Sequence, residues 1–185
     1  MTELTVHGIL PDVRYIASPH CDWRPGSGAV RLLVIHNISL PPGEFGGNAV
    51  IDLFTGRLDW DAHPYYRAMR GLRVSAHFFL RRNGELIQFV PTTRRAWHAG
   101  PSNWRGWERC NDYSIGVELE GTDTLPYTEA QYAGLNRLVG MLAEMYGDLP
   151  LAGHSDIAPG RKTDPGPAFD WGRMSAPAGA GGGQE

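Results

Sequence analysis

Cysteine is scarce in this sequence, and long apolar runs are absent. The 185 residues include only Cys21 and Cys110, so at most one disulfide could form, and neither cysteine belongs to a CxxC motif. These counts exclude a disulfide framework and a cysteine-based metal or redox site. No apolar run reaches the length of about 20 residues that a membrane-spanning helix needs. We therefore expect neither cysteine chemistry nor a membrane partner.

A recognisable export signal is also missing. Residues 1–7 (MTELTVH) have neither the basic start nor the apolar core of a secretory signal peptide, so we expect a cytoplasmic protein. A length of 185 residues suits one domain, and 42% hydrophobic with 20% charged residues is typical of a globular chain. We predict one domain over residues 1–175 and a flexible Gly/Ala-rich tail over residues 176–185, which we exclude from function.

Charge is spread unevenly along the chain. The net charge of −3 argues against general nucleic-acid binding. Residues 67–109, however, contain nine arginines and two glutamates, a net charge of +7 that leaves −10 for the remainder. Any one of these arginines is more often a solvated surface residue than a ligand contact. Together they indicate a small anionic ligand.

Lysine occurs once, in a chain that has sixteen arginines. This residue, Lys162, lies two positions before Asp164 in a segment rich in polar groups. Chance would place a single lysine in the window of residues 154–164 on only about 6% of occasions. Because a compact ammonium can stabilise the oxyanion that forms when a carbonyl is attacked, Lys162 is a candidate catalytic residue.

Three segments predict strands. Residues 31–36 (RLLVIH) form a short apolar run bounded by glycines and by a Pro-Pro-Gly sequence, which predicts a central strand with His36 at its C-terminal edge. Residues 74–82 and 85–90 flank Asn83-Gly84, which favours a hairpin with a tight two-residue turn. Polar groups at such strand ends are typical of binding sites.

Residues 114–120 (SIGVELE) predict a further strand. Its aliphatic residues alternate with Gly116, Glu118 and Glu120. Because successive side chains of a strand point to opposite faces, both carboxylates are expected on one face and the aliphatic residues on the other. We expect Glu120 to be structural.

One helix is predicted clearly. Thr128 and Gln131 form a capping box, apolar residues follow at helical spacing, and Gly147 supplies a stop. Shorter elements are expected at residues 49–54 and 64–72 (helices) and 151–152 (a strand that delivers His154). The predicted fold class is therefore α/β, a single domain with a central mixed β-sheet flanked by helices.

Two histidines and a carboxylate suggest a metal site. Two imidazoles and one carboxylate can hold Zn²⁺ and leave its fourth position open, as in catalytic zinc sites. The candidate ligands are His36, His154 and Asp164, with Asp156 as a competing carboxylate. Spacing alone does not decide, because no compact metal motif is present and each of the seven histidines is more often a packed or surface residue. His77, inside an apolar segment, is expected to be packed and hydrogen-bonded.

Several longer strings resemble a known family. They are VIHNISLPPGEFGG (34–47), VSAH (74–77), RAWHAG (95–100), ERCND (108–112), IGVELEGTDT (115–124) and RKTDPGP (161–167). Between about residues 19 and 171 the chain is similar to the zinc-dependent N-acetylmuramyl-L-alanine amidases of the type that shares its fold with peptidoglycan-recognition proteins. It most resembles their cytosolic AmpD-type branch, which hydrolyses 1,6-anhydromuropeptides in cell-wall recycling.

This resemblance implies roles for particular residues. It implies zinc as the cofactor, with His36, His154 and Asp164 as ligands and with Glu118 and Lys162 as catalytic residues. The positions that match substrate contacts are Asn37, Arg73, Trp97, His98 and Arg109. The implied partner is a small muropeptide, and no obligate protein partner is implied.

A mechanism follows from these roles. The resemblance implies that a bound zinc would acidify a water molecule. Glu118 would take the proton of that water and later deliver it to the departing alanine amine, and Lys162 would help to hold the oxyanion. Arg73 and Arg109 would form forked contacts with stem-peptide carboxylates, and Trp97 would offer a flat face to the sugar. Without the resemblance, a packed tryptophan would be the preferred interpretation of Trp97.

Two other classes stay open. A peptidoglycan-binding module would keep the cleft but perform no chemistry, and such a protein would be expected to lose a ligand or the acid/base residue. All five of those positions are filled here. A broad-range amidase that acts on intact cell wall is disfavoured by the missing signal and by the absence of a wall-binding repeat, although a wrongly assigned start site could conceal a signal.

Overall fold

The computed structural model describes residues 8–174, so the predicted tail over residues 176–185 lies outside the described residues. Within that range the strands are β1 (Arg14–Tyr15), β2 (Cys21–Trp23), β3 (Leu32–Ile38), β4 (Phe78–Leu80), β5 (Leu86–Gln88), β6 (Arg94–Ala96), β7 (Asn103–Trp104), β8 (Trp107–Glu108), β9 (Ser114–Glu120) and β10 (Leu151–Gly153). The helices are α1 (Ala49–Phe54), α2 (Pro64–Ala68), α3 (Glu129–Tyr146) and α4 (His154–Ile157), with 3₁₀ turns at Cys110–Asp112 and Trp171–Arg173.

A six-stranded sheet organises the chain. Its strand order is β1-β5-β4-β9-β3-β10. All neighbouring strands run parallel except β4 and β5, which form an antiparallel hairpin. The sheet is therefore mixed and central, and the predicted α/β class is confirmed.

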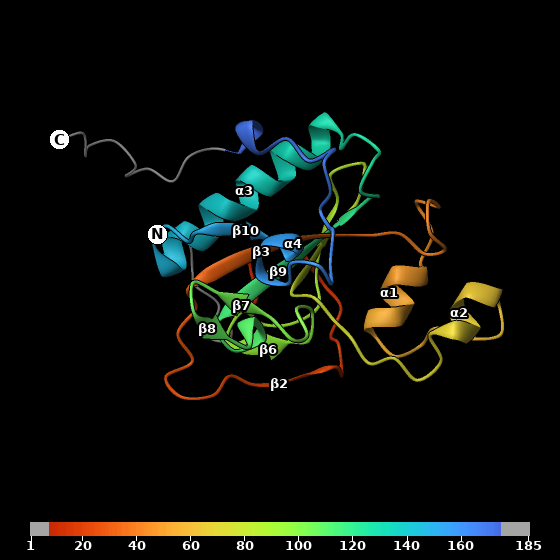
Figure 1. The fold of residues 1–185 in the computed structure, drawn as a ribbon, viewed down its shortest axis with the longest axis horizontal. Coiled ribbons are helices and arrows are strands. Elements are labelled where there is room, and N and C mark those ends of the chain that lie inside the picture. Colours follow the sequence, from red (N-terminus) through yellow and green to blue (C-terminus); the bar gives the residue numbers. More distant parts are fainter. Residues whose placement is uncertain (1–7, 175–185) are drawn as a thin grey trace.

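The sheet has an apolar core on each face. On one face, α3 packs against a core that includes Ile115, Val117 and Leu119 of β9. On the other face, α1 and α2 contribute to a second core with residues of β4 and β5. Figure 1 shows α3 lying along one side of the strands, with α1 and α2 together at one end of the molecule. The predicted alternation of β9 is confirmed, so Glu118 and Glu120 face away from α3.

Local signals predicted two of the helices, α3 and α1, well. The capping box of Thr128 and Gln131 begins α3, and Gly147 ends it with a φ of 74°. The expected helix at residues 49–54 is α1, and the expected strand before His154 is β10. No helix within residues 8–174 is long and apolar enough to cross a membrane.

Three local predictions need correction. First, β3 continues to Ile38 because it pairs with β9 two residues beyond His36, so His36 lies inside the strand. Second, the strands expected at residues 74–82 and 85–90 are shorter, because only β4 and β5 have ladder pairing. Between them, Arg81 N–H donates to the Glu85 carbonyl, which closes a three-residue loop in which only Gly84 has positive φ. Third, α2 ends at Ala68 rather than at residue 72, since the chain beyond it forms i→i−3 turn bonds up to Gly71, which has a φ of 85°.

Candidate active site

Parallel pairing brings the candidate residues together. His36 of β3 and Glu118 of β9 are Cα partners in adjacent parallel strands, so their side chains share the face opposite α3. On the other edge of β3, Gly153 of β10 pairs with Ile35, which places His154 beside His36. Asp164 follows α4 in a loop, where its carbonyl accepts the Ser155 N–H at 3.0 Å.

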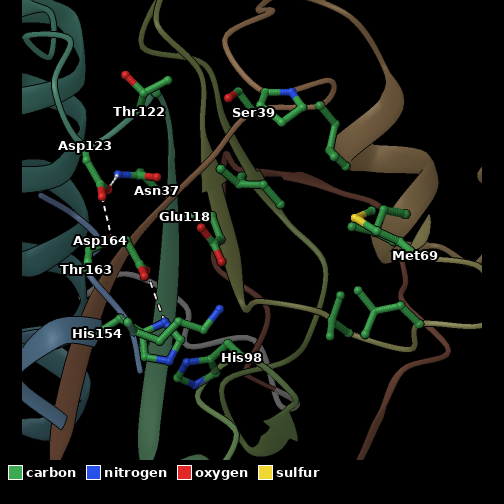
Figure 2. A pocket seen from close by; sticks show the side chains of 18 of the residues that line it. Asn37, Ser39, Met69, His98, Glu118, Thr122, Asp123, His154, Thr163 and Asp164 are labelled. Carbon is green, nitrogen blue, oxygen red and sulfur yellow. Dashed lines mark hydrogen bonds and ion pairs between the residues drawn. The ribbon is translucent and has the colours of Figure 1, made fainter. Parts of the chain in front are cut away.

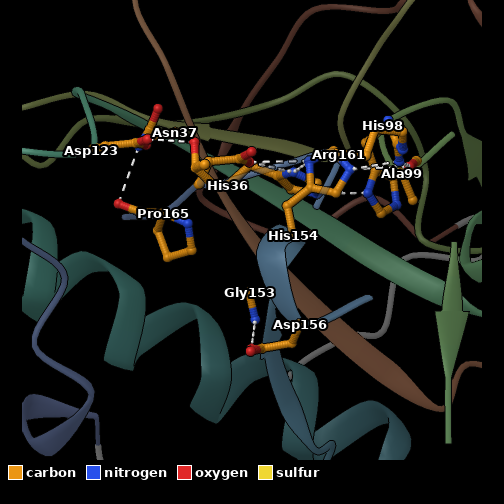
Figure 3. A network of polar contacts seen from close by, with 12 residues as sticks. His36, Asn37, His98, Ala99, Asp123, Gly153, His154, Asp156, Arg161 and Pro165 are labelled. Atoms are coloured by element: carbon orange, nitrogen blue, oxygen red, sulfur yellow. Dashed lines mark hydrogen bonds and ion pairs between the residues drawn. The ribbon is translucent and has the colours of Figure 1, made fainter. Parts of the chain in front are cut away.

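His36, His154 and Asp164 form a compact cluster. Their donor atoms lie within 4.8 Å of one another. The two Nδ1 atoms of His36 and His154 are 2.9 Å apart, and each lies 3.1 Å from Oδ2 of Asp164. The side chains are 1%, 4% and 14% exposed, respectively. Figure 3 shows the two imidazoles converging from neighbouring elements.

The contact made by Nε2 of His154, the ring nitrogen that points away from the cluster, indicates that the cluster suits a cation. His154 Nε2 lies 3.0 Å from the Ala99 carbonyl, which can only accept a hydrogen bond, so this nitrogen carries the proton in the neutral ring. The Nδ1 atom of His154 therefore presents a lone pair to Asp164 and His36. Three electron-pair donors thus point at one another, an arrangement that a divalent cation would neutralise.

Protonation states favour the same conclusion. Burial lowers the pKa of His36 to about 4, so this imidazole is neutral near pH 7. Burial acts to raise the pKa of Asp164, but its close contacts with the ring nitrogens of His154 and His36 outweigh burial and hold that pKa below its usual value. The cluster therefore offers a neutral imidazole and a carboxylate anion, which fits the chemistry of a zinc ligand set.

Glu118 has the properties of a proton carrier. Burial and the nearby charge of Asp164 raise its pKa well above the ordinary value, and Lys162 opposes them. Among the described residues, no hydrogen-bond partner reaches its buried Oε2 atom. A carboxyl group with a raised pKa and a free oxygen beside a metal-type cluster is suited to general acid–base chemistry.

A cavity of about 600 Å³ opens over these residues. Glu118, His154, Lys162 and Asp164 line one part of it, and apolar side chains of α1 and α2 line another part. Figure 2 shows Glu118 between the His154 and Asp164 side chains on one side and Met69 near α2 on the other. The exposed Lys162 is thus available to a ligand in the cavity. The site combines polar groups with an apolar wall, as small-molecule sites generally do.

Three predicted substrate contacts line this cavity, namely Asn37, Trp97 and His98. The Asn37 amide donates to Asp123 Oδ1 at 2.8 Å and to the Pro165 carbonyl at 3.1 Å, so it also joins two loops. The Trp97 ring is stacked on a histidine, with centroids 6.1 Å apart. His98 uses its Nδ1 atom in a 2.8 Å contact with His36.

Arg73 and Arg109 lie farther from the centre. Neither belongs to the described residues that line the cavity, although the neighbours of Arg73 on both sides do. Arg73 is exposed. The Arg109 side chain is 70% exposed, and its Nε lies 3.1 Å from Oδ2 of Asp112. The structure therefore places both arginines at the surface, with Arg109 already paired to a carboxylate.

Three other residues have structural partners. Asp156 accepts the Gly153 N–H at 2.7 Å, apart from the cluster, as Figure 3 shows. Glu120 accepts backbone N–H groups of two loops, at 2.6 and 3.0 Å, which fits the structural role expected for it. His77 is fully buried, with ring nitrogens that contact backbone groups of Arg94 and Gly116, as predicted.

Sequence reasoning missed two polar residues around the site. Asp123 accepts hydrogen bonds from Asn37 and from the Thr163 hydroxyl, at 2.8 and 2.5 Å. Asn111 accepts the backbone N–H groups of His98 and Ala99. Both residues lie inside the motifs quoted above, and that position was the one sign in the sequence that they matter. Their contacts join segments that are distant in the sequence, so no local pattern predicts them.

Comparison with known proteins defines the class. The profile of the N-acetylmuramoyl-L-alanine amidase family matches residues 26–167, which include every residue of the cluster and Glu118. The chain belongs to this family and is an amidase. The resemblance seen in the sequence motifs is thereby confirmed.

Within this family, the chain is highly similar to particular amidases. The chain is 56% identical over 173 residues to the 1,6-anhydro-N-acetylmuramyl-L-alanine amidase AmpD of Escherichia coli (strain K12), covering 92% of this chain and 94% of that protein. A crystal structure of a selenomethionine AmpD derivative aligns with a TM-score of 0.89 and 55% identity, covering 91% of this chain and 95% of that chain. The amidase AmiD of E. coli, solved with anhydro-N-acetylmuramic acid-L-Ala-D-γ-Glu-L-Lys, aligns at 32% identity and a TM-score of 0.56, over 78% of this chain and 55% of that chain.

Proposed function

We propose that this protein is a zinc-dependent hydrolase of 1,6-anhydromuropeptides. It cleaves the amide bond between the lactyl group of 1,6-anhydro-N-acetylmuramic acid and the L-alanine of the stem peptide. The observation that carries this proposal is the convergence of His36, His154 and Asp164 beside Glu118, whose buried carboxyl oxygen has no hydrogen-bond partner among the described residues. The high identity to AmpD proteins supports the choice of substrate.

The cluster would hold the zinc ion. His36 and His154 would bind it through Nδ1, and Asp164 would bind it through a carboxylate oxygen. When bound, zinc supplies a Lewis acid that polarises a carbonyl and acidifies a water molecule. Two neutral imidazoles and one carboxylate leave such a centre with net positive charge, which favours both effects.

Glu118 would act as the general base and then as the general acid. As the oxygen of a water molecule bonds to the lactyl carbonyl carbon, the Glu118 carboxylate takes a proton from that water. When the C–N bond breaks, the same carboxyl group delivers the proton to the alanine nitrogen, which leaves as an amine. The raised pKa of Glu118 suits this exchange, because it strengthens the carboxylate as a proton acceptor.

Lys162 would face the developing oxyanion. It lies in the loop that carries Asp164, it lines the cavity, and its charge acts on Glu118. An ammonium next to the attacked carbonyl stabilises negative charge in the transition state more than in the ground state.

The cavity and its rim would bind the substrate. Asn37 and Trp97 line the cavity, and they would contact the sugar and the lactyl group. Arg73 and Arg109 lie outside its wall and would reach the carboxylates of the stem peptide by forked hydrogen bonds. His98 was assigned to substrate by the resemblance, and its partners point to a different role, described below.

The wider assignments are part of the same proposal. We propose a cytoplasmic enzyme in peptidoglycan recycling whose single amidase domain spans residues 1–175. Its partner would be a small muropeptide, with no nucleic acid, membrane or obligate protein partner.

Hydrolysis in ¹⁸O-labelled water tests the reaction directly. The expected products from a 1,6-anhydromuropeptide are anhydro-N-acetylmuramic acid with one ¹⁸O in its lactyl carboxylate and an unlabelled peptide with a free alanine amine. Mass spectrometry distinguishes these products. Label in the peptide, or no cleavage by the zinc-loaded protein, would contradict the proposal.

A further inference from the structure

One short loop segment contacts the outer nitrogens of both histidines in the cluster. His36 Nε2 lies 2.8 Å from His98 Nδ1, and His154 Nε2 lies 3.0 Å from the carbonyl of Ala99. Two consecutive residues between β6 and β7 therefore contact both imidazoles. Figure 3 shows His98 and Ala99 together on the far side of these rings from Asn37.

Asn111 holds this segment in place. Its side-chain oxygen accepts the N–H of His98 at 3.1 Å and the N–H of Ala99 at 2.9 Å. The carbonyl of Ala99 also accepts a hydrogen bond from Arg161 at 2.5 Å. One carboxamide thus fixes the two peptide units that face the histidines.

The His98 ring is held on the sheet. A Cβ atom at Gly116 of β9 would lie 2.5 Å from the ring, so this glycine makes the space that the ring occupies. In addition, His98 Nε2 lies 3.2 Å from the Ser114 hydroxyl oxygen of the same strand. The ring therefore has a defined position and a polar partner at each nitrogen.

These partners link the tautomer of His36 to that of His98. If His98 carries its proton on Nε2 and donates it to Ser114, its Nδ1 accepts the Nε2–H of His36. The Nδ1 lone pair of His36 then faces Asp164 and His154. The opposite tautomer of His98 would force a proton onto His36 Nδ1, between the proposed ligands, where it would oppose metal binding.

We propose that His98 and Asn111 are positioning residues for the metal-binding histidines, rather than substrate contacts. His98 sets the tautomer and orientation of His36, and Asn111 holds both His98 and the Ala99 carbonyl that orients His154. This inference rests on the proposed zinc-dependent function. Loss of such an outer partner typically weakens metal binding by about 10–100-fold.

Zinc affinity of matched variants tests the proposal. In H98N the side-chain oxygen takes the place of Nδ1 as acceptor, whereas the similarly sized H98L offers none. Asn111→Asp keeps an acceptor for the two N–H groups, and Asn111→Leu removes it. Asn103→Leu in β7 is the control, because the exposed Asn103 side chain accepts only the Gly106 N–H at 2.9 Å in the described structure and contacts neither histidine. Competition with a chromophoric chelator gives each zinc dissociation constant.

We expect His98→Leu and Asn111→Leu to weaken zinc binding about 10–100-fold, with His98→Asn, Asn111→Asp and Asn103→Leu within a few-fold of the natural protein. Long-range ¹⁵N–¹H NMR spectra of the zinc-loaded protein should show His36 protonated at Nε2. If His98→Leu does not fold, H98Q replaces it, because its amide reaches the Nε2 position and leaves no acceptor at Nδ1.

The outcomes separate the two proposals. Unchanged zinc affinity in folded His98→Leu or H98Q, with a raised KM, would make His98 a substrate contact and overturn the positioning role. An equal loss of zinc affinity in all His98 variants, including His98→Asn, would also overturn the positioning role. Natural protein that binds no zinc would overturn the proposed function itself, and the positioning role with it.

Discussion

His36 and Glu118 are Cα partners in neighbouring parallel strands, and both side chains lie on the sheet face opposite α3. This pairing places a candidate metal ligand and a candidate proton carrier side by side on two interior strands of the six-stranded sheet. Because β9 is flanked by β3 and β4, neither residue can shift without disturbing the centre of the sheet. The pairing therefore supplies the preorganisation that the proposed hydrolysis needs.

The two glutamates of β9 should behave differently. E118Q should keep zinc and fold normally but lower kcat by about 10²–10⁴-fold, because an amide cannot carry the proton. Glu120→Gln is the matched control, and it should lower the free energy of unfolding by about 1–3 kcal/mol while leaving kcat nearly unchanged, because it removes one of the two oxygens that accept part-buried backbone N–H groups. Steady-state kinetics and chemical denaturation measure these effects. The reverse pattern would exchange the two roles.

Alanine variants of Asp164 and Asp156 should differ in the amount of zinc that they bind. D164A removes the single anionic donor of the cluster, so zinc bound after gel filtration should fall severely. Asp156→Ala removes a cap on the Gly153 N–H and should cost about 1 kcal/mol of stability with zinc retained. Metal analysis and thermal unfolding of the two variants provide the readouts. Full zinc in Asp164→Ala with loss in Asp156→Ala would show that the ligand assignment is wrong.

Arg109 should affect binding more than chemistry. R109A should raise KM roughly tenfold to a hundredfold with little change in kcat, since a charge-assisted contact is worth about 1.5–3 kcal/mol. Arg73→Ala should behave similarly. Arg67→Ala, which removes another exposed arginine paired with an aspartate, should leave KM unchanged.

A substrate without stem-peptide carboxylates provides the second arm of that experiment. It should bind more weakly to the natural protein and be nearly insensitive to Arg109→Ala, because the partner of the arginine is already absent. Equal weakening of both substrates by Arg109→Ala would instead assign the arginine to its ion pair with Asp112 and to a structural role.

His77 should make the fold sensitive to acid. Burial, helped by the charge of Arg24, lowers its pKa from 6.5 to about 3. A folded-state pKa below the unfolded value means that stability is fully present above about pH 6.5 and is lost as the pH falls toward 3. Between pH 7.5 and 5 this loss should be about 2 kcal/mol. Urea unfolding of zinc-free H77Q should show a shallower pH dependence by that amount, whatever its absolute stability. An identical pH dependence in both proteins would refute this assignment.

Short-range signals predicted most of the fold. The capping box of Thr128 and Gln131, and the two-residue alternation of β9, depend only on near neighbours and were confirmed. The end of β3 and the loop at Gly84 were predicted less well, because strand pairing decides them. In β3 the pairing with β9 carries the strand beyond His36, and no feature of the segment itself marks that extension.

The candidate site was predictable to a similar degree. Family motifs identified the residues that the structure brings together, including His36, His154 and Asp164, whose spacing alone was not decisive. The motifs did not indicate that His98 contacts His36, 62 positions away, or that Asn111 holds its backbone. Such contacts depend on how distant loops meet, so they become visible only in the folded structure.

The central claim is tested most directly by comparing two substrates on one preparation whose metal content is known. Purified protein is incubated with a 1,6-anhydromuropeptide and, separately, with intact sacculus, and the released peptide is quantified for each. We predict close to one zinc per chain, rapid cleavage of the anhydromuropeptide, little release from the sacculus, and loss of cleavage after treatment with a strong chelator. Full zinc with binding but no cleavage would identify a recognition module, and comparable release from intact sacculus would identify a broad-range wall amidase; either result would contradict the account.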